Sequence, residues 1–414
     1  MATVDGTISW AGAQQTILGC LQPLPAEAAP LDQALGRVTA EQLLAGEDVP
    51  PFTNSAMDGF AVQTADLQRI APGQQVRLQV LADLPAGRTA SVQVGPGQAV
   101  RIMTGAPLPD GADCVVPVED TASCGEQVAV LRTQQQGANV RQAGEDIRSG
   151  TVLLEAGTVL RPAELGLLAS VGCGRVAVHR VPRVAVVTTG DELCGPDEPL
   201  APGRIRDSNS TTMSAQVRQC GAAPLLFPRV PDTRLAVRTA LEEALGQADV
   251  VLTSGGVSMG EYDFVKEVLA ELGARPLFWR VAQKPGHPLA FWLLDGRPVF
   301  GIPGNPVSTM ICLEVYVRPA LRRMMGHRQL FRPERDGVLV EGYRKRADGR
   351  LHFLRVRVEE LHGLLLARST GPQGSGILTS MARANGLALI PEEIREIEPG
   401  HAVRLQLTEL PEDH

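Results

Sequence analysis

Residues 184–193 read VAVVTTGDEL, a short unbroken apolar run that ends in a polar turn containing glycine. The same pattern returns at residues 250–263, VVLTSGGVSMGEYD, and at residues 299–308, VFGIPGNPVS. Apolar runs of this length are typical of strands buried on both faces, as in a parallel sheet covered by helices. Helical stretches follow the turns and begin near Asp207, Asp232, Glu261 and Pro306. The sequence therefore predicts a doubly wound, mostly parallel α/β domain over about residues 181–326.

Three further regions flank this α/β pattern. The first, up to about residue 49, opens with apolar residues at helical spacing. Residues 50–141 are rich in Gln, Val, Gly and Pro with short alternating stretches, which predicts a small β domain. The last region, about 331–414, contains the strictly alternating segment 352–358 and predicts a second small β domain.

Composition excludes several classes of protein. The 414 residues carry a formal charge of −7, which does not suit binding to nucleic acid. No apolar stretch approaches the ~20 residues of a membrane span, and the start MATVDGTISW does not resemble a secretory signal. The seven cysteines are scattered and never spaced C-x-x-C, so we expect neither a disulfide framework nor a zinc site. These features predict a cytoplasmic protein.

The three polar turns share a position that points to a ligand. Each directly follows a predicted parallel strand, and ligands of open α/β sheets bind outside the carboxyl ends of the strands. Glycine lets backbone N–H groups approach a phosphate closely. The alternative is that these glycines only form turns. Because the three turns belong to neighbouring strands, we favour a cradle for a phosphate or nucleotide, although none matches a Walker A or Rossmann motif.

Carboxylates in the same turns predict a divalent cation. Asp191, Glu192 and Asp263 are expected close to the bound phosphate, where their charges repel each other and the ligand. Mg²⁺ resolves such a conflict, because it binds one or two carboxylates together with phosphate oxygens and water. The alternative is that each acid caps the N-terminus of a helix.

A fourth motif, QKPGHP at residues 283–288, places Lys284 and His287 around a Pro-Gly turn. By itself it could be a solvated turn. Together with PPFTNSAMDGFAV (50–62), RIMTGAPLP (101–109), GEDI (144–147) and GPQGSGILTS (371–380), however, it resembles the molybdopterin molybdenumtransferases. These are the MoeA proteins of bacteria, whose relative is the E domain of gephyrin, and the motifs follow the family's order over nearly the whole chain.

The resemblance implies an enzyme for the last step in making the basic molybdenum cofactor. Such an enzyme takes adenylylated molybdopterin and molybdate as substrates, uses Mg²⁺, inserts molybdenum and releases AMP. It implies a homodimer that can contact the preceding adenylyltransferase and molybdoenzyme chaperones. The implied domains are a discontinuous N-terminal domain of residues 1–49 and 142–180, an inserted β domain of 50–141, the α/β domain of 181–326 and a C-terminal β domain of 331–414.

The resemblance also implies the residues of the site. The catalytic residues it indicates are Asp58, Thr104, Asp146, Glu192 and Asp263, of which Glu192 and Asp263 are the metal ligands. Residues implied for binding the pterin nucleotide are Ser55, Gly190, Asp191, Ser254, Gly255, Gly256, Ser258, Gly304 and Asn305. Those implied for molybdate are Lys284, His287, Pro288, Arg355 and Ser375, a set of cationic and hydroxyl groups that suits a tetrahedral dianion.

His287 departs from the family pattern, in which lysine commonly occupies this position. An imidazole titrates near pH ~6.5, so it can be neutral where lysine is cationic. Either bound molybdate keeps the imidazole protonated, or the site has one positive charge fewer and binds the oxyanion less tightly. We therefore expect apparent molybdate affinity to weaken as pH rises.

Two competing functions share parts of this pattern. The first is the adenylyltransferase of the preceding step, or a nucleotide pyrophosphatase built on the same α/β domain. The second is a non-catalytic scaffold that binds molybdopterin. The flanking motif at residues 50–62 argues against the first, and the retained acids Asp58, Asp146, Glu192 and Asp263 argue against the second.

Overall fold

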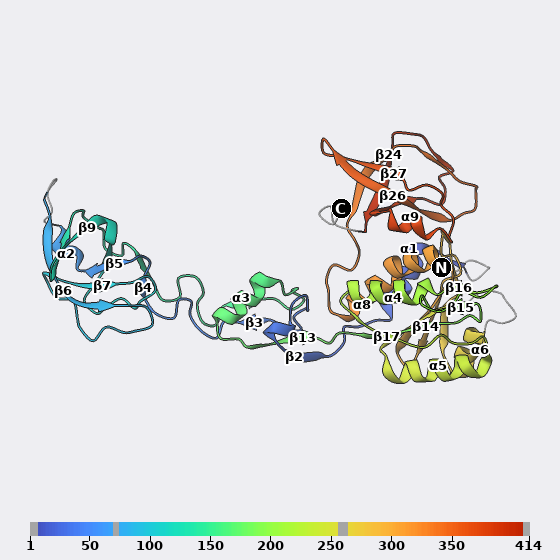
Figure 1. Cartoon of the computed structure of the whole chain (residues 1–414), viewed down its shortest axis with the longest axis horizontal. Coiled ribbons are helices and arrows are strands. Elements are labelled where there is room, and N and C mark those ends of the chain that lie inside the picture. Colours follow the sequence, from blue (N-terminus) through green and yellow to red (C-terminus); the bar gives the residue numbers. More distant parts are fainter. Residues whose placement is uncertain (1–6, 69–73, 256–263, 409–414) are drawn as a thin grey trace.

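The computed structural model describes residues 7–68, 74–255 and 264–408. The molecule is elongated: one β domain lies at one end, the α/β unit and a second β domain lie at the other, and a narrow arm joins them (Figure 1). No helix in the described ranges is long and apolar enough to span a membrane.

A six-stranded sheet forms the centre of the α/β unit. Its strands lie in the order β17 (Ala223–Leu226), β14 (Arg183–Thr188), β18 (Val250–Ser254), β23 (Arg297–Ile302), β22 (Ala290–Leu294) and β19 (Arg275–Phe278). The first four are parallel, and β22 is antiparallel to both of its neighbours. The three predicted strands are the parallel centre of this sheet. The mostly parallel α/β prediction is confirmed.

Helices cover both faces of this sheet, as the unbroken apolar runs predict. Val184 and Val186 belong to a core with α1 (Trp10–Gly19), α4 (Ser208–Gln219), α7 (Pro306–Cys312) and α8 (Arg318–Met324). Ala185 and Val187 face the other way, into a core with α5 (Arg234–Gln247) and α6 (Phe264–Glu271). Between α7 and α8 the chain forms the π-helical turn η3 (Leu313–Val317).

Capping residues explain where two of these helices begin. Asp207 accepts a hydrogen bond from the Ser210 N–H, as expected for the start of α4. Asp232 was expected to begin α5, but that prediction is wrong by one residue. Thr233 is the N-cap, because its hydroxyl accepts from the Ala236 N–H, and the Asp232 carboxylate is engaged elsewhere.

The first residues of the chain contact the α/β unit. Strand β1 (Thr7–Ile8) pairs with β20 (Arg280–Val281), and α1 contacts α8 and η3. The predicted division assigns these residues to the N-terminal domain of 1–49 and 142–180, whose remaining segments form the arm.

The arm consists of an outgoing and a returning segment that pair along its length. Strand β2 (Ala26–Pro30) pairs with β13 (Arg175–His179), and β3 (Leu43–Leu44) pairs with β12 (Val152–Leu154). A further bridge joins Val49 to Ile147. Helix α3 (Pro162–Ser170) packs its Leu168 into a small core with Leu160 and Val176.

The inserted β domain is a six-stranded sheet. Its order is β8 (Cys114–Pro117), β5 (Gly59–Val62), β7 (Gln98–Ile102), β6 (Val76–Leu84), β10 (Gln127–Val130) and β9 (Thr121–Cys124). A short ladder of β4 (Asn54–Ser55) and β11 (Val140–Arg141) connects the sheet to the arm, and α2 (Thr64–Leu67) follows β5. Strands β5 and β8 approach closely at Gly59, where a Cβ would lie 2.0 Å from the Val116 carbonyl oxygen.

The C-terminal β domain closes into a small barrel. Strands β26 (Leu351–Leu361), β27 (Leu364–Ser369), β24 (Glu334–Leu339), β30 (His401–Leu407) and β28 (Gly386–Ile390) are neighbours in that order, and β28 also pairs with β26. Strand β21 (Gln283–Lys284), from the α/β unit, adds to β26 in parallel. Because β26 faces the barrel core with Leu354 and the α/β unit with Phe353, both of its faces are buried.

Candidate active site

The turns after β14, β18 and β23 meet at one edge of the sheet, as their positions predict. The Thr189 N–H donates to the Ser254 carbonyl at 3.1 Å, and the Gly255 N–H donates to the Ile302 carbonyl at 3.2 Å. Gly255 has φ +93°, and a Cβ there would lie 2.8 Å from the Thr189 carbonyl oxygen. Only glycine fits this conformation and this spacing without strain. Gly256, Ser258 and Asp263, also assigned to this site, lie outside the described residues.

Asn209, in the first turn of α4, ties two of these turns together. Its Nδ2 donates to Ser254 Oγ at 2.8 Å and to the Gly304 carbonyl at 2.7 Å. Its Oδ1 is buried and has no hydrogen-bond partner among the residues that the structure describes. A buried acceptor of this kind suits a donor from a ligand. Sequence reasoning missed this role, because Asn209 was interpreted only as part of a helix start.

Three carboxylates gather beside the turn after β14. The Asp191 N–H donates to Asp232 Oδ2 at 3.3 Å, and the Asp232 N–H donates to Asp191 Oδ1 at 3.2 Å. Burial raises the pKa of Asp232, and the charges of Asp191 and Glu192 add to the rise. The Glu192 carboxylate lies over Gly190, where a Cβ would be 2.6 Å from Glu192 Oε2. Repulsion among these acids favours a cation beside them.

We tested whether these residues fit Mg²⁺. In the described ranges no three Asp, Glu, His or Cys side chains form a metal-binding group. A Mg²⁺ site that completes its shell with phosphate oxygens and water needs only one or two carboxylates. Asp191 and Glu192 are exposed at this edge, and the unpaired Oδ1 of Asn209 belongs to the same set of turns. The donor set therefore fits a cation that is shared with a phosphate.

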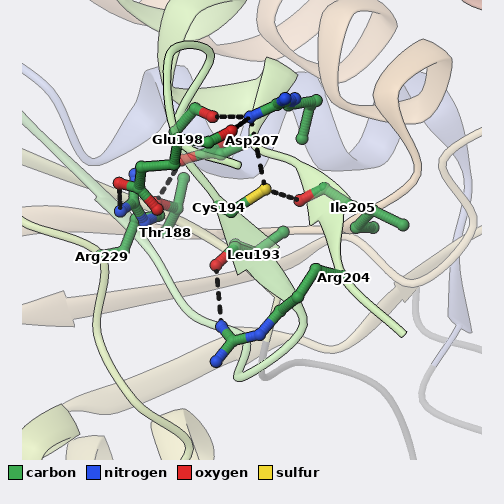
Figure 2. Close-up of polar contacts among 10 residues, drawn as sticks. Thr188, Leu193, Cys194, Glu198, Arg204, Ile205, Asp207 and Arg229 are labelled. Atoms are coloured by element: carbon green, nitrogen blue, oxygen red, sulfur yellow. Dashed lines mark hydrogen bonds and ion pairs between the residues drawn. The ribbon is translucent and has the colours of Figure 1, made fainter. Parts of the chain in front are cut away.

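The segment after Glu192 is held in place by a polar network (Figure 2). Thr188 Oγ1 donates to Asp207 Oδ2 at 2.9 Å, which joins the end of β14 to the start of α4. The short strands β15 (Leu193–Cys194) and β16 (Ile205–Arg206) pair, and Arg229 forms an ion pair with Glu198 in the loop between them. The acids at residues 191 and 192 are thus anchored on both sides.

The 283–288 turn and the C-terminal β domain adjoin the same edge. Lys284 is exposed, and β21 places it opposite His352 of β26. His287 is half-buried, with its Nδ1 2.6 Å from the Val281 carbonyl oxygen, and Pro288 is half-buried beside it. The Ser375 carbonyl accepts from the Val307 N–H at 3.0 Å, so the 371–376 loop meets α7 directly after Gly304 and Asn305.

Arg355, which the resemblance assigns to molybdate, is buried between the C-terminal β domain and the 371–376 loop. Its side chain is 1% exposed, and it donates from Nη2 to the Gly374 carbonyl and from Nε to Ser380 Oγ, each at 3.0 Å. Burial lowers its pKa to about 10. These contacts hold the loop that carries Ser375.

A second cluster lies in the inserted β domain and its connection to the arm. Asp58 Oδ1 accepts from the N–H and the hydroxyl of Thr104, both at 2.7 Å. These bonds, the backbone bond first, lower the pKa of Asp58, and the charge of Arg101 adds to the effect. Ser55 is buried and its hydroxyl donates to the Met57 carbonyl at 2.5 Å. Asp146 is exposed, and its N–H donates to the Val49 carbonyl at 3.0 Å.

The two clusters lie at opposite ends of the chain's fold. Figure 1 places β4, β5 and β7 at one end and β14, β16 and α4 at the other. A separation seen in projection cannot exceed the true separation, so the chain does not bring Asp58 and Thr104 to the turns of the α/β unit. The family resemblance implies one cleft for these residues, whereas within one chain the two clusters lie apart.

Comparisons with known proteins agree with this architecture. Residues 8–172 match the MoeA N-terminal region (domain I and II), residues 185–323 a probable molybdopterin binding domain, and residues 340–408 the MoeA C-terminal region (domain IV). The crystal structure of the molybdopterin biosynthesis MoeA protein from Pyrococcus horikosii superimposes with a TM-score of 0.84 at 30% identity. That match covers 97% of this chain and 99% of the other.

Curated relatives show the same extent of similarity. Molybdopterin molybdenumtransferase 2 of Mycobacterium tuberculosis is 39% identical over 386 residues, which is 92% of this chain and 94% of that protein. Molybdopterin molybdenumtransferase of Bacillus subtilis is 35% identical over 381 residues, or 91% of this chain and 88% of the other. With its three matched regions in order and its fold superimposed over almost its whole length, the chain belongs to the molybdopterin molybdenumtransferase family.

Proposed function

We propose that this chain inserts molybdenum from molybdate into adenylylated molybdopterin and releases AMP, the last step in making the basic molybdenum cofactor. The observation that carries the proposal is the convergence of the three turns after β14, β18 and β23 with the 283–288 turn and the 371–376 loop. A phosphate-binding edge thus lies next to a turn that carries two potentially cationic side chains. The reaction requires both features, because its substrates are a phosphoanhydride and an oxyanion.

The turns hold the adenylate linkage for cleavage. The backbone around Gly190, Gly255 and Gly304 approaches a phosphate without obstruction from a Cβ. Ser254 is held by Asn209, which leaves the Asn209 Oδ1 as an acceptor for the ligand. No covalent intermediate with the protein is needed: positioning and electrostatic stabilisation suffice for an oxygen of water or of molybdate to attack phosphorus, form the new phosphorus–oxygen bond and displace the bridging oxygen of the anhydride with its phosphate.

Asp191 and Glu192 would hold Mg²⁺ together with substrate phosphate oxygens, and we retain the assignment of Asp263 to the same cation. The chemistry that Mg²⁺ supplies when bound is the neutralisation of charge on those oxygens. Asp232 holds Asp191 in place, because the backbone N–H of each residue donates a hydrogen bond to the carboxylate of the other. The carboxylates thereby keep a fixed orientation before substrate arrives.

Lys284, His287 and Ser375 are proposed to contact molybdate. The His287 Nδ1 donates to the Val281 carbonyl, so the positive charge of the ring depends on the proton at Nε2. Arg355 is assigned a positioning part: its contacts with Gly374 and Ser380 hold the loop that presents Ser375. Pro288 shapes the turn.

We further propose that the protein acts as a homodimer in which each site combines two subunits. The support is the separation of Asp58, Thr104 and Asp146 from the α/β turns within one chain (Figure 1). A two-fold axis that places the β domain of one subunit against the α/β turns of its partner creates two equal, complete sites. A cytoplasmic location, and contact with the preceding adenylyltransferase and with molybdoenzyme chaperones, remain predictions.

The test is to mix the protein with adenylylated molybdopterin, Mg²⁺ and molybdate and to measure AMP. We expect AMP release that depends on both molybdate and Mg²⁺, with one molybdenum bound for each AMP formed. A Glu192→Gln variant serves as the inactive control. Adenylylation of free molybdopterin by ATP would instead indicate the adenylyltransferase of the preceding step. Binding of the pterin nucleotide without turnover would indicate a scaffold.

A further inference from the structure

Gln283 is a fully buried amide directly before the turn that carries Lys284 and His287. Its side chain is 0% exposed, and Nε2 lies 3.1 Å from the Pro285 carbonyl oxygen and 3.3 Å from the Gly286 carbonyl oxygen. Gly286 has φ +91°, and a Cβ there would lie 2.6 Å from Gln283 Nε2 and 2.7 Å from Cys312 Sγ. The turn is therefore fitted closely around this amide.

Tyr316 fixes which way the amide points. Its hydroxyl, 1% exposed and located in the π-helical turn η3, donates to Gln283 Oε1. With Oε1 engaged by a donor, Nε2 must face the turn. Burial raises the pKa of Tyr316 well above its ordinary range, so the hydroxyl remains a donor at any working pH. The arrangement joins η3 to the turn through one side chain.

The Gln283 amide contributes to the direction in which the carbonyl groups of the turn point. Gln283 Nε2 donates to the carbonyls of Pro285 and Gly286, and the Leu289 N–H donates to the same Gly286 carbonyl at 3.3 Å. The Val281 N–H donates to the carbonyl of His287 at 2.9 Å. All three carbonyls are thereby directed into the protein. A carbonyl oxygen directed at an oxyanion would repel it, whereas N–H groups and cations attract it. Within the described part of the chain, the N–H of Gly286 has no partner, and the ammonium of Lys284 is exposed.

We propose that Gln283, oriented by Tyr316, is a positioning residue for oxyanion binding: it holds the carbonyls of Pro285 and, together with the Leu289 N–H, Gly286 away from the oxyanion, so that the turn presents donors and cations to it. This inference rests on the proposed function, because it assigns the bound oxyanion to molybdate. It concerns molybdate alone, since no contact of Gln283 reaches Ser254, Gly255 or the acids of the nucleotide edge among the residues described.

The test compares three variants in molybdate titrations of the folded, full-length protein. Gln283→Met keeps the length of the side chain but removes the donor, and we expect a rise of about tenfold in the molybdate KM with kcat within about twofold. Gln283→Glu turns an oxygen toward the carbonyls and should raise KM further. Tyr316→Phe, which deletes one atom, should raise it about threefold.

Controls separate this role from general packing. Gln216→Met removes a half-buried amide of the same α/β unit whose Nε2 donates to the Met310 carbonyl, and it should leave molybdate KM unchanged. The binding constant for adenylylated molybdopterin, measured by calorimetry, should be unaltered in Gln283→Met and Tyr316→Phe. If Gln283→Met fails to fold, the molybdate KM of Tyr316→Phe still tests the proposal.

Two results would overturn the inference. One is an unchanged molybdate KM in folded Gln283→Met and Tyr316→Phe proteins. The other is an equal loss of molybdate and pterin-nucleotide binding, which would indicate a structural role only. Failure of the proposed function is seen separately, in the unaltered protein: if it neither binds molybdate nor releases AMP in its presence, both proposals are refuted.

Discussion

Asp58 and Thr104 are joined by two hydrogen bonds that end on the same carboxylate oxygen, Oδ1, each 2.7 Å long. Asp58 precedes β5 and Thr104 follows β7, so the pair ties together two neighbouring strands of the inserted sheet. Both bonds favour the ionised carboxylate, and its pKa is lowered as a result. The pair therefore presents a fixed negative charge at the end of the arm.

Removing the Thr104 hydroxyl should weaken this charge. A Thr104→Val variant keeps the N–H bond but loses the hydroxyl bond, so the pKa of Asp58 rises toward its ordinary value and the carboxylate is aimed less well. We expect AMP release to fall about three- to tenfold at neutral pH and acid inactivation to begin at higher pH. The pH–rate profile checks this. Thr104→Ser, which keeps the hydroxyl, should match the parent, and identical profiles for Val and Ser would contradict the argument.

Mixed dimers decide whether one site uses two subunits. A dimer of one Asp58→Asn chain and one Glu192→Gln chain, isolated with two different tags, should have one intact site and about half of the wild-type activity. A dimer of one wild-type chain and one chain with both substitutions should be nearly inactive, because each site then has one defect. The activity of both dimers is measured as AMP release. If the first dimer is inactive and the second keeps about half of the activity, each site lies within one subunit.

The proton on His287 Nε2 should control the affinity for molybdate. Because Nδ1 is held by the Val281 carbonyl, the positive charge depends on Nε2. Apparent affinity should weaken by up to about tenfold per pH unit as the ring loses this proton, since one proton is linked to binding. Equilibrium titration with molybdate checks this. A His287→Lys variant should bind with an affinity nearly independent of pH over the same range, and a profile parallel to the parent's would refute the role.

An ion pair at the base of the arm should contribute to stability. Arg180 donates to both oxygens of Asp249 at 2.6 and 2.8 Å, and the Arg183 N–H donates to Oδ2 at 2.7 Å. Burial by itself would raise the pKa of Asp249, but these bonds and charges outweigh it and lower the pKa. The stabilisation is therefore present at neutral pH and is lost as pH falls through the lowered pKa of the folded state.

We expect Asp249→Asn to cost about 1–3 kcal/mol at pH 7. The difference from the parent in urea midpoint should shrink in acid, where Asp249 of the parent is protonated. A matched control is Asp336→Asn, which removes an exposed partner of Arg404 and should cost less than about 0.5 kcal/mol. Equal effects of the two substitutions would show that the bidentate geometry and burial do not matter.

The sequence was sufficient for the α/β unit because local signals determine it. The strands over 184–187, 250–252 and 299–302 are buried on both faces, so their apolar runs are unbroken, and the polar turns must then lie at one edge. The N-cap at Asp207 was predicted correctly for the same reason. The error at Asp232 shows the limit, because the choice between adjacent caps depends on the distant partner Asp191.

Contacts between distant segments could not be predicted from spacing. Asn209 reaches Ser254 and Gly304 only after the helices are placed, and Gln283 meets Tyr316 across 33 residues of chain. The burial of Arg355 follows from β26 lying between the barrel and the α/β unit, whereas alternation alone shows only that its side chain shares a face with Phe353. The distance between the Asp58 cluster and the turns of the α/β unit depends on the length of the arm. No sequence motif indicates that length.

Because the arm consists of two paired segments, its length depends on the number of residues in both of them. The outgoing chain over 26–55 is bonded to the returning chain over 140–179 from β2 and β13 to β4 and β11. Deleting residues from one segment would slip the ladder, whereas deleting opposite residues from both would shorten the arm and leave the ladder in register. The length of the arm, more than any single contact, therefore determines how far the carboxylate of Asp58 lies from the α/β unit.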